Sequence, residues 1–173
     1  MKPPGAVRLQ TRIIGVAEPL RQCAVHHRHL RRCMGGLVGV EVVRLDTGWP
    51  CAWGIVGRPL SRYLQADGWV ELVRGIVPPA APPGCASAVI AAAARWARSE
   101  KRPAIISYTL EHEPGTSYRA AGWVQVGWGG GGQWACPSRS AEQRTGAIAG
   151  RKRRWVPAWA VPAAVARGWP VGE

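Results

Sequence analysis

The chain has 173 residues, a length that suits one domain with a buried core. Its formal net charge of +13 favours a polyanionic partner, nucleic acid first and a phosphate-rich cofactor second. A basic protein that simply over-uses arginine is the alternative interpretation of that charge. No apolar run approaches the ~20 residues of a membrane span, and the N-terminus lacks the apolar segment of a secretory signal. We therefore expect a cytoplasmic protein with no membrane partner.

The first part of the chain predicts a strand, a helix and a hairpin. Residues 7–16 predict the strand, and Ala17-Glu18-Pro19 is typical of a helix start because proline and an acid suit the first turn. We expect this helix to run to Arg32. Residues 37–45 and 49–56 flank an Asp-Thr-Gly turn, which predicts an antiparallel hairpin.

The expected helix carries histidines near its end. By three- and four-residue spacing, His26, His29 and Cys33 fall on one helical face. Two imidazoles and a thiolate can hold Zn or Fe and leave a position open. His26 or His29 can instead act as a general base. The third interpretation is a basic, solvated helix end, and the sequence leaves all three open.

A strand, a loop, a helix, a second strand and a short helix follow in that order. The loop is rich in proline and small residues. A loop that opens a helix leaves free backbone N–H groups at the positive end of the helix dipole, which suits a phosphate. Together with the hairpin, this order predicts an α+β (mixed α/β) domain. The ranges are 70–77, 78–84, 85–98, 104–110 and 116–121.

The composition changes after predicted strands at 124–128 and 133–136. We expect residues 1–136 to form the domain and 137–173 a basic, Trp-rich C-terminal tail of low order. A basic run beside an indole can pair with phosphates and stack on a base, and a solvated tail is the alternative. The run consists of Arg151, Lys152, Arg153, Arg154 and Trp155.

Short motifs between about residues 20 and 155 are specific in combination, although no single one is. They are His26-His27-Arg28-His29, Val56-Gly57-Arg58-Pro59, Glu71-Leu72-Val73-Arg74, Cys85-Ala86-Ser87, Tyr108-Thr109-Leu110, Glu113-Pro114-Gly115-Thr116-Ser117, Arg119-Ala120-Ala121-Gly122-Trp123, Gly130-Gly131-Gly132, Pro137-Ser138-Arg139 and Lys152-Arg153-Arg154-Trp155. With the order of elements, this set resembles the GNAT (Gcn5-related N-acetyltransferase) superfamily. Within it, the set looks most like the phage and prophage Mom-like branch, implicated in DNA modification.

The resemblance implies a GNAT-like central mixed sheet flanked by helices, which binds acetyl-CoA or another acyl-CoA. Ile76 and Val77 would then offer backbone groups to the pantetheine and the thioester oxygen. Tyr118, four residues before the Gly-Trp pair, would protonate the leaving thiolate; a core or surface aromatic on a short helix is the alternative. The implied pyrophosphate site is the helix start, with Gly84, Cys85, Ala86 and Ser87.

Acyl transfer to an amine also needs a base for the amine proton. Glu71 lies on the strand before the loop and is the best-placed candidate, with His26, His29 and His112 as others. A carboxylate on a partly buried face is costly unless it has a role or a partner. An ion pair with Arg58 or Arg74 is the structural alternative.

The Mom-like resemblance makes the acceptor the exocyclic amine of adenine in DNA, within a bacterial host cell. Such a base must leave the duplex stack before it can react. Candidate DNA contacts are Arg28, Arg58 and Arg74 together with the basic run of the tail. Two alternatives remain: an acetyltransferase of a small-molecule or protein amine, and a non-catalytic basic DNA-binding protein on the same scaffold.

Overall fold

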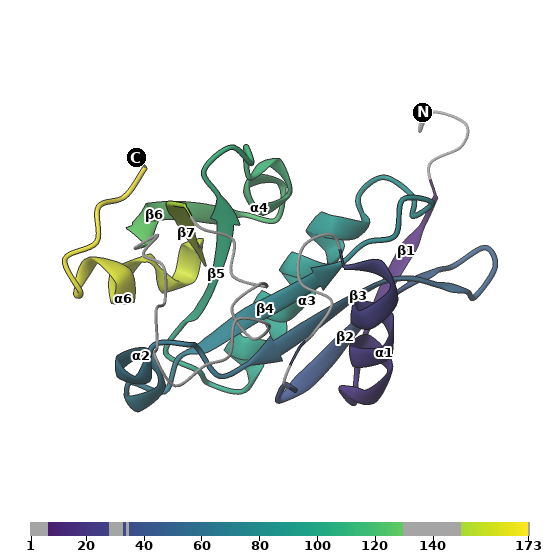
Figure 1. Ribbon diagram of the computed structural model, residues 1–173, viewed down its shortest axis with the longest axis horizontal. Coiled ribbons are helices and arrows are strands. Elements are labelled where there is room, and N and C mark those ends of the chain that lie inside the picture. Colours follow the sequence, from purple (N-terminus) through teal and green to yellow (C-terminus); the bar gives the residue numbers. More distant parts are fainter. Residues whose placement is uncertain (1–6, 28–32, 34, 130–149, 173) are drawn as a thin grey trace, which may run out of the picture.

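The computed structural model describes residues 7–27, 33, 35–129 and 150–172. Within these residues one mixed sheet of seven strands has the order β1-β2-β3-β4-β5-β7-β6 (Figure 1). Neighbouring strands are antiparallel except β4 and β5, which are parallel. The strands are β1 Leu9–Ile14, β2 Val38–Arg44, β3 Pro50–Gly57, β4 Val70–Ile76, β5 Ile105–Leu110, β6 Trp123–Gly129 and β7 Lys152–Pro157.

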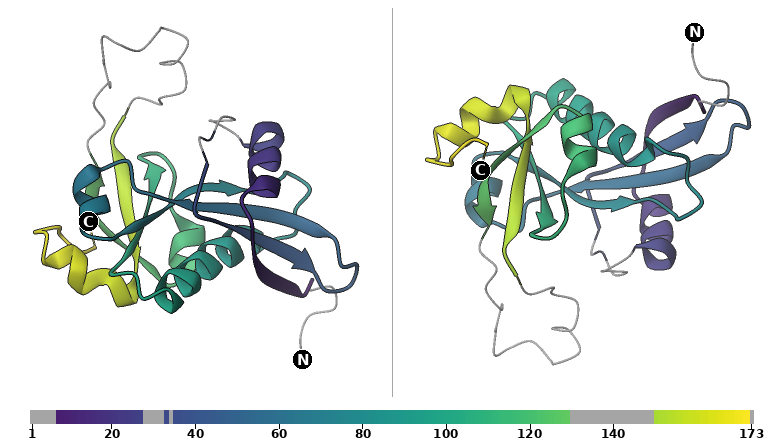
Figure 2. Two further views of the ribbon diagram at one scale, coloured as in Figure 1. Left: turned by 90° about the horizontal axis from the view of Figure 1, so that it is seen from below. Right: turned by 90° about the horizontal axis from the view of Figure 1, so that it is seen from above.

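Helices cover both faces of the sheet, and α1 and α3 lie on opposite faces (Figure 2). The expectation of a mixed α/β fold with a central sheet flanked by helices is therefore confirmed. No helix among the described residues is long and apolar enough to cross a membrane. The helices are α1 Ala17–His26, α2 Arg62–Ala66, α3 Cys85–Ser99, α4 Thr116–Ala120, the 3-10 turn η1 Ala158–Ala160 and α6 Val161–Val165.

The main core lies between α3 and the first strands. Alanines on the buried face of α3 let the helix approach the sheet closely. Gly54 on β3 shows how closely, because a Cβ there would lie 2.6 Å from Cγ1 of Val89. Val70 and Leu72 of β4 belong to this core, so the residue between them, Glu71, faces the other side of the sheet.

Helix α1 is shorter than the sequence indicates. It ends at His26, and His27 already has extended backbone angles of φ −69° and ψ 127°. The expectation of a helix to Arg32 is therefore wrong at its C-terminal end. Residues 28–32 lie outside the described part of the chain, as do the strand expected at 133–136 and the neighbouring glycines.

The largest difference from expectation is β7, which was expected to be part of a tail. Residues 152–157 form a strand between β5 and β6, at the centre of the C-terminal half of the sheet. The prediction of a low-order tail is therefore wrong for these residues. Trp155 is 1% exposed, and its indole Nε1 donates to Thr109 Oγ1 at 2.9 Å. The strand is held by core packing and not by a solvated basic surface.

Candidate active site

Strands β4 and β5 pair only briefly and then diverge. Their ladder contains Val70–Ile105 and Glu71–Ile106, although β4 continues to Ile76. Beyond that point β4 follows β3, and β5 pairs with β7 from Ser107 onwards. Figure 1 shows the two strands parting. We call this divergence the splay; it leaves facing strand edges that are not paired with each other.

Tyr118 reaches the splay from α4. Gly115 begins this helix in the left-handed region at φ 67°, and a Cβ at that position would overlap the ring of Trp155. The Tyr118 ring stacks on Trp155 with centroids 5.4 Å apart and meets the edge of Trp123 at 5.5 Å. The two contacts hold the phenol in one orientation.

A hydrogen-bonded chain connects Tyr118 to the backbone of β4. The Ser107 hydroxyl donates to the carbonyl oxygen of Leu72 at 3.0 Å, and Ser107 Oγ lies 2.7 Å from Tyr118 Oη. Because Ser107 has one proton and Leu72 O can only accept, Tyr118 must be the donor to Ser107. Burial, opposed by the Ser107 hydrogen bond, raises the pKa of Tyr118 to about 12. Tyr118 is thus a protonated phenol at neutral pH, fixed at the point where the strands part.

Glu71 lies at the same point but on the other face of the sheet. Its side chain is 6% exposed and accepts the backbone N–H of Leu60 at 3.2 Å. Burial raises the pKa of Glu71 to about 7, against the Leu60 hydrogen bond and the positive charges of Arg74 and Lys152. The ion pair with Arg58 or Arg74, which was the structural alternative, does not occur among the described residues; Glu71 accepts the backbone N–H of Leu60 instead.

The splay therefore has a proton acceptor on one face and a proton donor on the other. Glu71 exchanges its proton near neutral pH, whereas Tyr118 keeps its proton until it meets a stronger base. The charge of Glu71 is also one cause of the raised pKa values of Tyr108 and Tyr118, so these groups share one electrostatic environment. Glu71 can take a proton on one face of the sheet, and Tyr118 can give one on the other face. This arrangement suits the transfer of a chemical group between two ligands that meet at the splay.

The start of α3 provides a second element of the site. Gly84 caps the helix at φ 90°, and Ala88 N donates to Gly84 O, so the first-turn N–H groups of Ala86 and Ser87 have no partner within the helix. The N–H of Cys85 instead donates to Pro82 O at 3.3 Å. Since Pro82 and Pro83 have no N–H, the loop adds few donors to this candidate anion site.

Three other residues of the implied cofactor site have buried or half-buried side chains. Ile76 is fully buried in the cluster beneath α1, and Val77 packs against the α3 core, so each can offer only its backbone. Cys85 is 1% exposed with its Sγ 3.5 Å from Sγ of Cys51. Burial first, then the Cys51 contact, raises the pKa of Cys85 to about 12, so it is an inert thiol.

The metal interpretation of His26, His29 and Cys33 loses the helical spacing on which it depended. His26 is the last helical residue, and Cys33 lies outside the helix with its Sγ 3.4 Å from Gly35 O. His29 and Arg28 are outside the described residues. Among the residues that are described, no group of three His, Cys, Asp or Glu could hold a metal ion. His26 remains a candidate base only because α1 covers the face of the sheet on which Glu71 lies.

The basic run expected to contact DNA is built into the sheet. Arg153 donates to Gln125 Oε1 at 3.1 Å and to Glu111 O at 3.1 Å, and its guanidinium lies 4.8 Å from the Trp128 ring. Arg154 lies 4.3 Å from the ring of Trp169. The buried indole of Trp155 cannot stack on a base, so that prediction is wrong.

Arg151 differs in exposure from Lys152 and Arg74. Arg151 is exposed, 4.5 Å from the Trp128 ring and 4.0 Å from a Glu111 carboxylate oxygen. Lys152 is half-buried, and its charge lowers the pKa of Glu71. Arg74 donates to Val73 O at 2.6 Å and acts on Glu71 in the same direction. Lys152 and Arg74 therefore belong to the electrostatic surroundings of the candidate base.

Sequence reasoning missed Ser107. A serine within the apolar strand Ile105–Leu110 is the available signal, because Ser107 and Thr109 alternate on one face of that strand. Both are buried, and their hydroxyls bind the half-buried Tyr118 and the buried Trp155 respectively. Buried hydroxyls need such partners, which a sequence alone does not name.

The sequence matches no family profile and no curated protein, so the comparisons rest on structure. A spermidine N-acetyltransferase chimera with a Vibrio cholerae component matches with a TM-score of 0.58 and 12% identity, over 92% of this chain and 99% of that one. A polyamine N-acetyltransferase from Drosophila melanogaster matches with a TM-score of 0.55 and 9% identity, over 86% and 99%.

Two larger acetyltransferases also match in part. The chain spans 61% of a streptothricin acetyltransferase structure from Bacillus anthracis and 64% of nourseothricin acetyltransferase, each with a TM-score of 0.47. At identities of 9–13%, all these similarities concern the fold alone. The chain therefore has the fold of the GNAT acetyltransferases, as the order of its elements indicated.

Proposed function

We propose that this protein is an acyl-CoA-dependent N-acyltransferase. The observation that carries the proposal is the splay, where Glu71 with a pKa of about 7 and the protonated Tyr118 lie on opposite faces of the sheet. Acyl transfer to an amine needs one group to remove the amine proton and another to protonate the leaving thiolate. The splay offers both, together with unpaired strand edges that suit an extended ligand rich in amides.

Acyl-CoA would supply an acyl group activated as a thioester. The backbone at Ile76 and Val77 would hold its pantetheine arm, and the N–H groups of Ala86 and Ser87 after Gly84 would hold its pyrophosphate. These residues fit the group, although the proline-rich loop provides few backbone donors.

The reacting residues then have defined roles. The Glu71 carboxylate takes a proton from the attacking amine as the C–N bond forms. As the C–S bond breaks, Tyr118 gives its Oη proton to the departing sulfur. Ser107 holds the Tyr118 hydroxyl in place before the transfer, through the bond it makes to Leu72 O. Acid and base thus act on opposite sides of the carbonyl carbon.

We further propose that the acceptor is the exocyclic amine of adenine in DNA. The net charge of +13 supports a polyanionic acceptor, and the Mom-like motifs suggest DNA. The same charge disfavours a polyamine, because a strongly basic protein repels a polycation. Acylation of another amine, or DNA binding without catalysis, is the alternative outcome of the test below.

The test combines binding, turnover and product analysis. Purified protein is titrated with acetyl-CoA and then incubated with acetyl-CoA and duplex DNA, and the digested nucleosides are examined by mass spectrometry. We expect a heavier deoxyadenosine from the wild type. Tyr118→Phe and Glu71→Gln should still bind acetyl-CoA but lose about 10²–10⁴-fold in rate. Tyr63→Phe is the control, because Tyr63 is 67% exposed and has no role in the proposed reaction.

Each other outcome has a distinct meaning. Acetyl-CoA binding with unmodified DNA would overturn the DNA acceptor and direct the search to other amines. Absence of acetyl-CoA binding in folded protein would overturn the transferase itself. The pH dependence is a further check: because Glu71 must lose its proton to act, kcat/KM should rise through about pH 7.

A further inference from the structure

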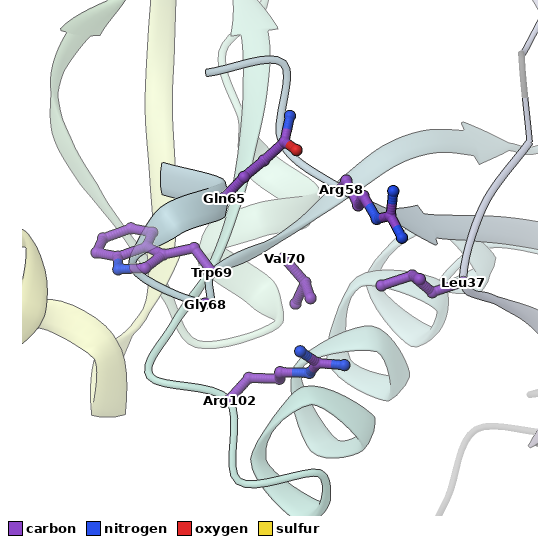
Figure 3. A pocket seen from close by; sticks show the side chains of 7 residues that line it. All are labelled: Leu37, Arg58, Gln65, Gly68, Trp69, Val70 and Arg102. Atoms are coloured by element: carbon purple, nitrogen blue, oxygen red, sulfur yellow. The ribbon is translucent and has the colours of Figure 1, made fainter. Parts of the chain in front are cut away.

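A basic pocket lies at the end of β4 remote from the start of α3. It has a volume of about 250 Å³ and lies between the end of β3, the start of β4 and the link from α3 to β5 (Figure 3). Arg58 and Arg102 direct their guanidinium groups toward the space in front of Val70, and Leu37 forms the opposite wall. We call it the Arg58–Arg102 pocket.

Neither arginine has a partner within the part of the chain that is described. The Nε of Arg102 is buried without a hydrogen bond, and no ion pair to Arg58 or Arg102 occurs there. A buried donor without an acceptor is costly, and two cations that face one space repel each other. Arg102 follows the C-terminal end of α3, where the helix dipole favours a positive charge. The dipole does not explain why a second positive charge, that of Arg58, lies on the other side of the pocket.

The nearby acids are engaged elsewhere. Asp67 forms an ion pair with Arg167, and Glu71 accepts the backbone N–H of Leu60. The remaining polar side chain of the lining, Gln65, donates to Pro59 O at 2.7 Å and so fixes the loop that carries Arg58. The pocket therefore brings the guanidinium groups of exposed Arg58 and half-buried Arg102 to one space, with no acidic partner among the described residues.

We propose that the Arg58–Arg102 pocket binds a phosphate group. Two guanidinium groups present paired N–H donors from two directions, which suits a tetrahedral group with several charged oxygens. Since a water molecule occupies roughly 30 Å³, a volume near 250 Å³ accepts a phosphate and part of the group attached to it. The phosphate can come from a nucleotide monoester or from a DNA backbone, which share this chemistry. The proposal is independent of acyl transfer.

The first test uses inorganic phosphate with Arg58→Gln, Arg102→Gln and the double variant. Thermal stability is measured against phosphate concentration at constant ionic strength, with chloride as the reference. We expect phosphate to raise the melting temperature of the wild type, and each single variant to weaken its apparent affinity about tenfold or more. The double variant should lose less than the product of the single effects, because both side chains hold one ligand.

Arg98→Gln is the matched control, since Arg98 is an exposed arginine on the last turn of α3. It removes the same charge near the same helix end and should leave the phosphate response unchanged. Equal phosphate responses in the wild type and both pocket variants would overturn the proposal. A loss in Arg98→Gln as large as in Arg102→Gln would do so as well, because it would reveal only a general charge effect.

The second test separates the two phosphate sources. Thymidine 5′-monophosphate and a DNA duplex are titrated against each variant at several salt concentrations. If the pocket holds a backbone phosphate, Arg58→Gln and Arg102→Gln should reduce the slope of log K against log salt by about one for the duplex. If it holds a monoester, nucleotide binding should weaken about tenfold and the duplex slope should stay unchanged. Binding of neither ligand at the pocket would overturn the proposal.

Discussion

The arginines of β7 and those of the Arg58–Arg102 pocket carry the same charge in opposite situations. Arg153 bonds a side-chain amide and a carbonyl oxygen and lies over an indole, and Arg154 lies over another. Arg58 and Arg102 have no such partners among the described residues, and one of their nitrogens is buried without any. Arg153 and Arg154 are held within the sheet by internal contacts, whereas Arg58 and Arg102 are free to bind an anion.

This difference shows what net charge can and cannot predict. A charge of +13 indicates a polyanionic partner, but it does not say which arginines are available to that partner. Arginines that already satisfy their donors inside the protein gain little from a phosphate, because one hydrogen bond only replaces another. Stability measurements can separate the two kinds, since internal partners contribute to folding and unsatisfied charges do not.

The largest expected effect is on the β7 side of the comparison. Trp155→Ala should lower the free energy of unfolding by about 3–5 kcal/mol, because it empties a fully buried site and leaves Thr109 Oγ1 without its donor. Urea denaturation followed by circular dichroism measures the change. The control is Trp49→Ala, because Trp49 is 73% exposed, and it should change stability by less than about 0.5 kcal/mol. If Trp155→Ala also changed the free energy of unfolding by less than about 0.5 kcal/mol, β7 would be a solvated tail and not part of the core.

Glu71 offers a second contrast, since it is buried at a cost to stability. Its pKa is about 7 in the folded chain and near 4.5 when unfolded. Between these values the folded state binds more protons, so stability falls as pH rises from 4.5 to 7 and the penalty is constant above that range. Glu71→Gln should therefore match the wild type at pH 4 and exceed it by up to about 3 kcal/mol at pH 8.

Denaturant unfolding at the two pH values tests this prediction. Glu100→Gln, at an exposed position after α3, should leave stability unchanged at both. A Glu71→Gln protein less stable than the wild type at pH 8 would mean that the carboxylate supports the fold. In that case the assignment of Glu71 as a base held in place for catalysis would lose its physical ground.

A smaller loss is expected for Arg153→Ala. The substitution removes hydrogen bonds to Gln125 and Glu111 O and a cation–π contact with Trp128, which together should contribute about 1–2 kcal/mol. Arg98→Ala, at an exposed site with the same charge, is the comparison and should stay within about 0.5 kcal/mol of the wild type. Equal free energies of unfolding for the two variants would show that the contacts of Arg153 do not stabilise the fold.

The elements predicted correctly depend on local pattern. The hairpin of β2 and β3 and the unit from β4 to α4 follow from nearby turns, alternation and a helix-forming run. Glu71 and Tyr118 could be selected because a carboxylate in an apolar strand and a tyrosine before a Gly-Trp pair are visible in the sequence. Whether they act as base and acid stays a prediction.

The elements that were missed depend on distant partners. β7 is a strand because β5 and β6 lie on either side of it and because rings from other segments cover its arginines. Ser107 acquires its role from Leu72 and Tyr118, which lie 35 and 11 residues away. The end of α1 at His26 removed the helical spacing on which the metal prediction depended. In each case tertiary contacts or backbone geometry overrode the local pattern.

The smallest expected effect is at the pocket. Arg102→Gln and Arg58→Gln should leave the free energy of unfolding within about 0.5 kcal/mol of the wild type or raise it slightly, because each removes a charge that repels its neighbour. Denaturation in a phosphate-free buffer measures this. With phosphate present the order should reverse, since the wild type binds the anion more tightly and therefore gains more stability from it than either variant. A loss of 1–2 kcal/mol without phosphate, like that of Arg153→Ala, would show that these arginines also have internal partners. An arginine that serves a ligand should affect the free energy of unfolding only when the anion is present. An arginine that serves the sheet, such as Arg153, should affect it without the anion as well.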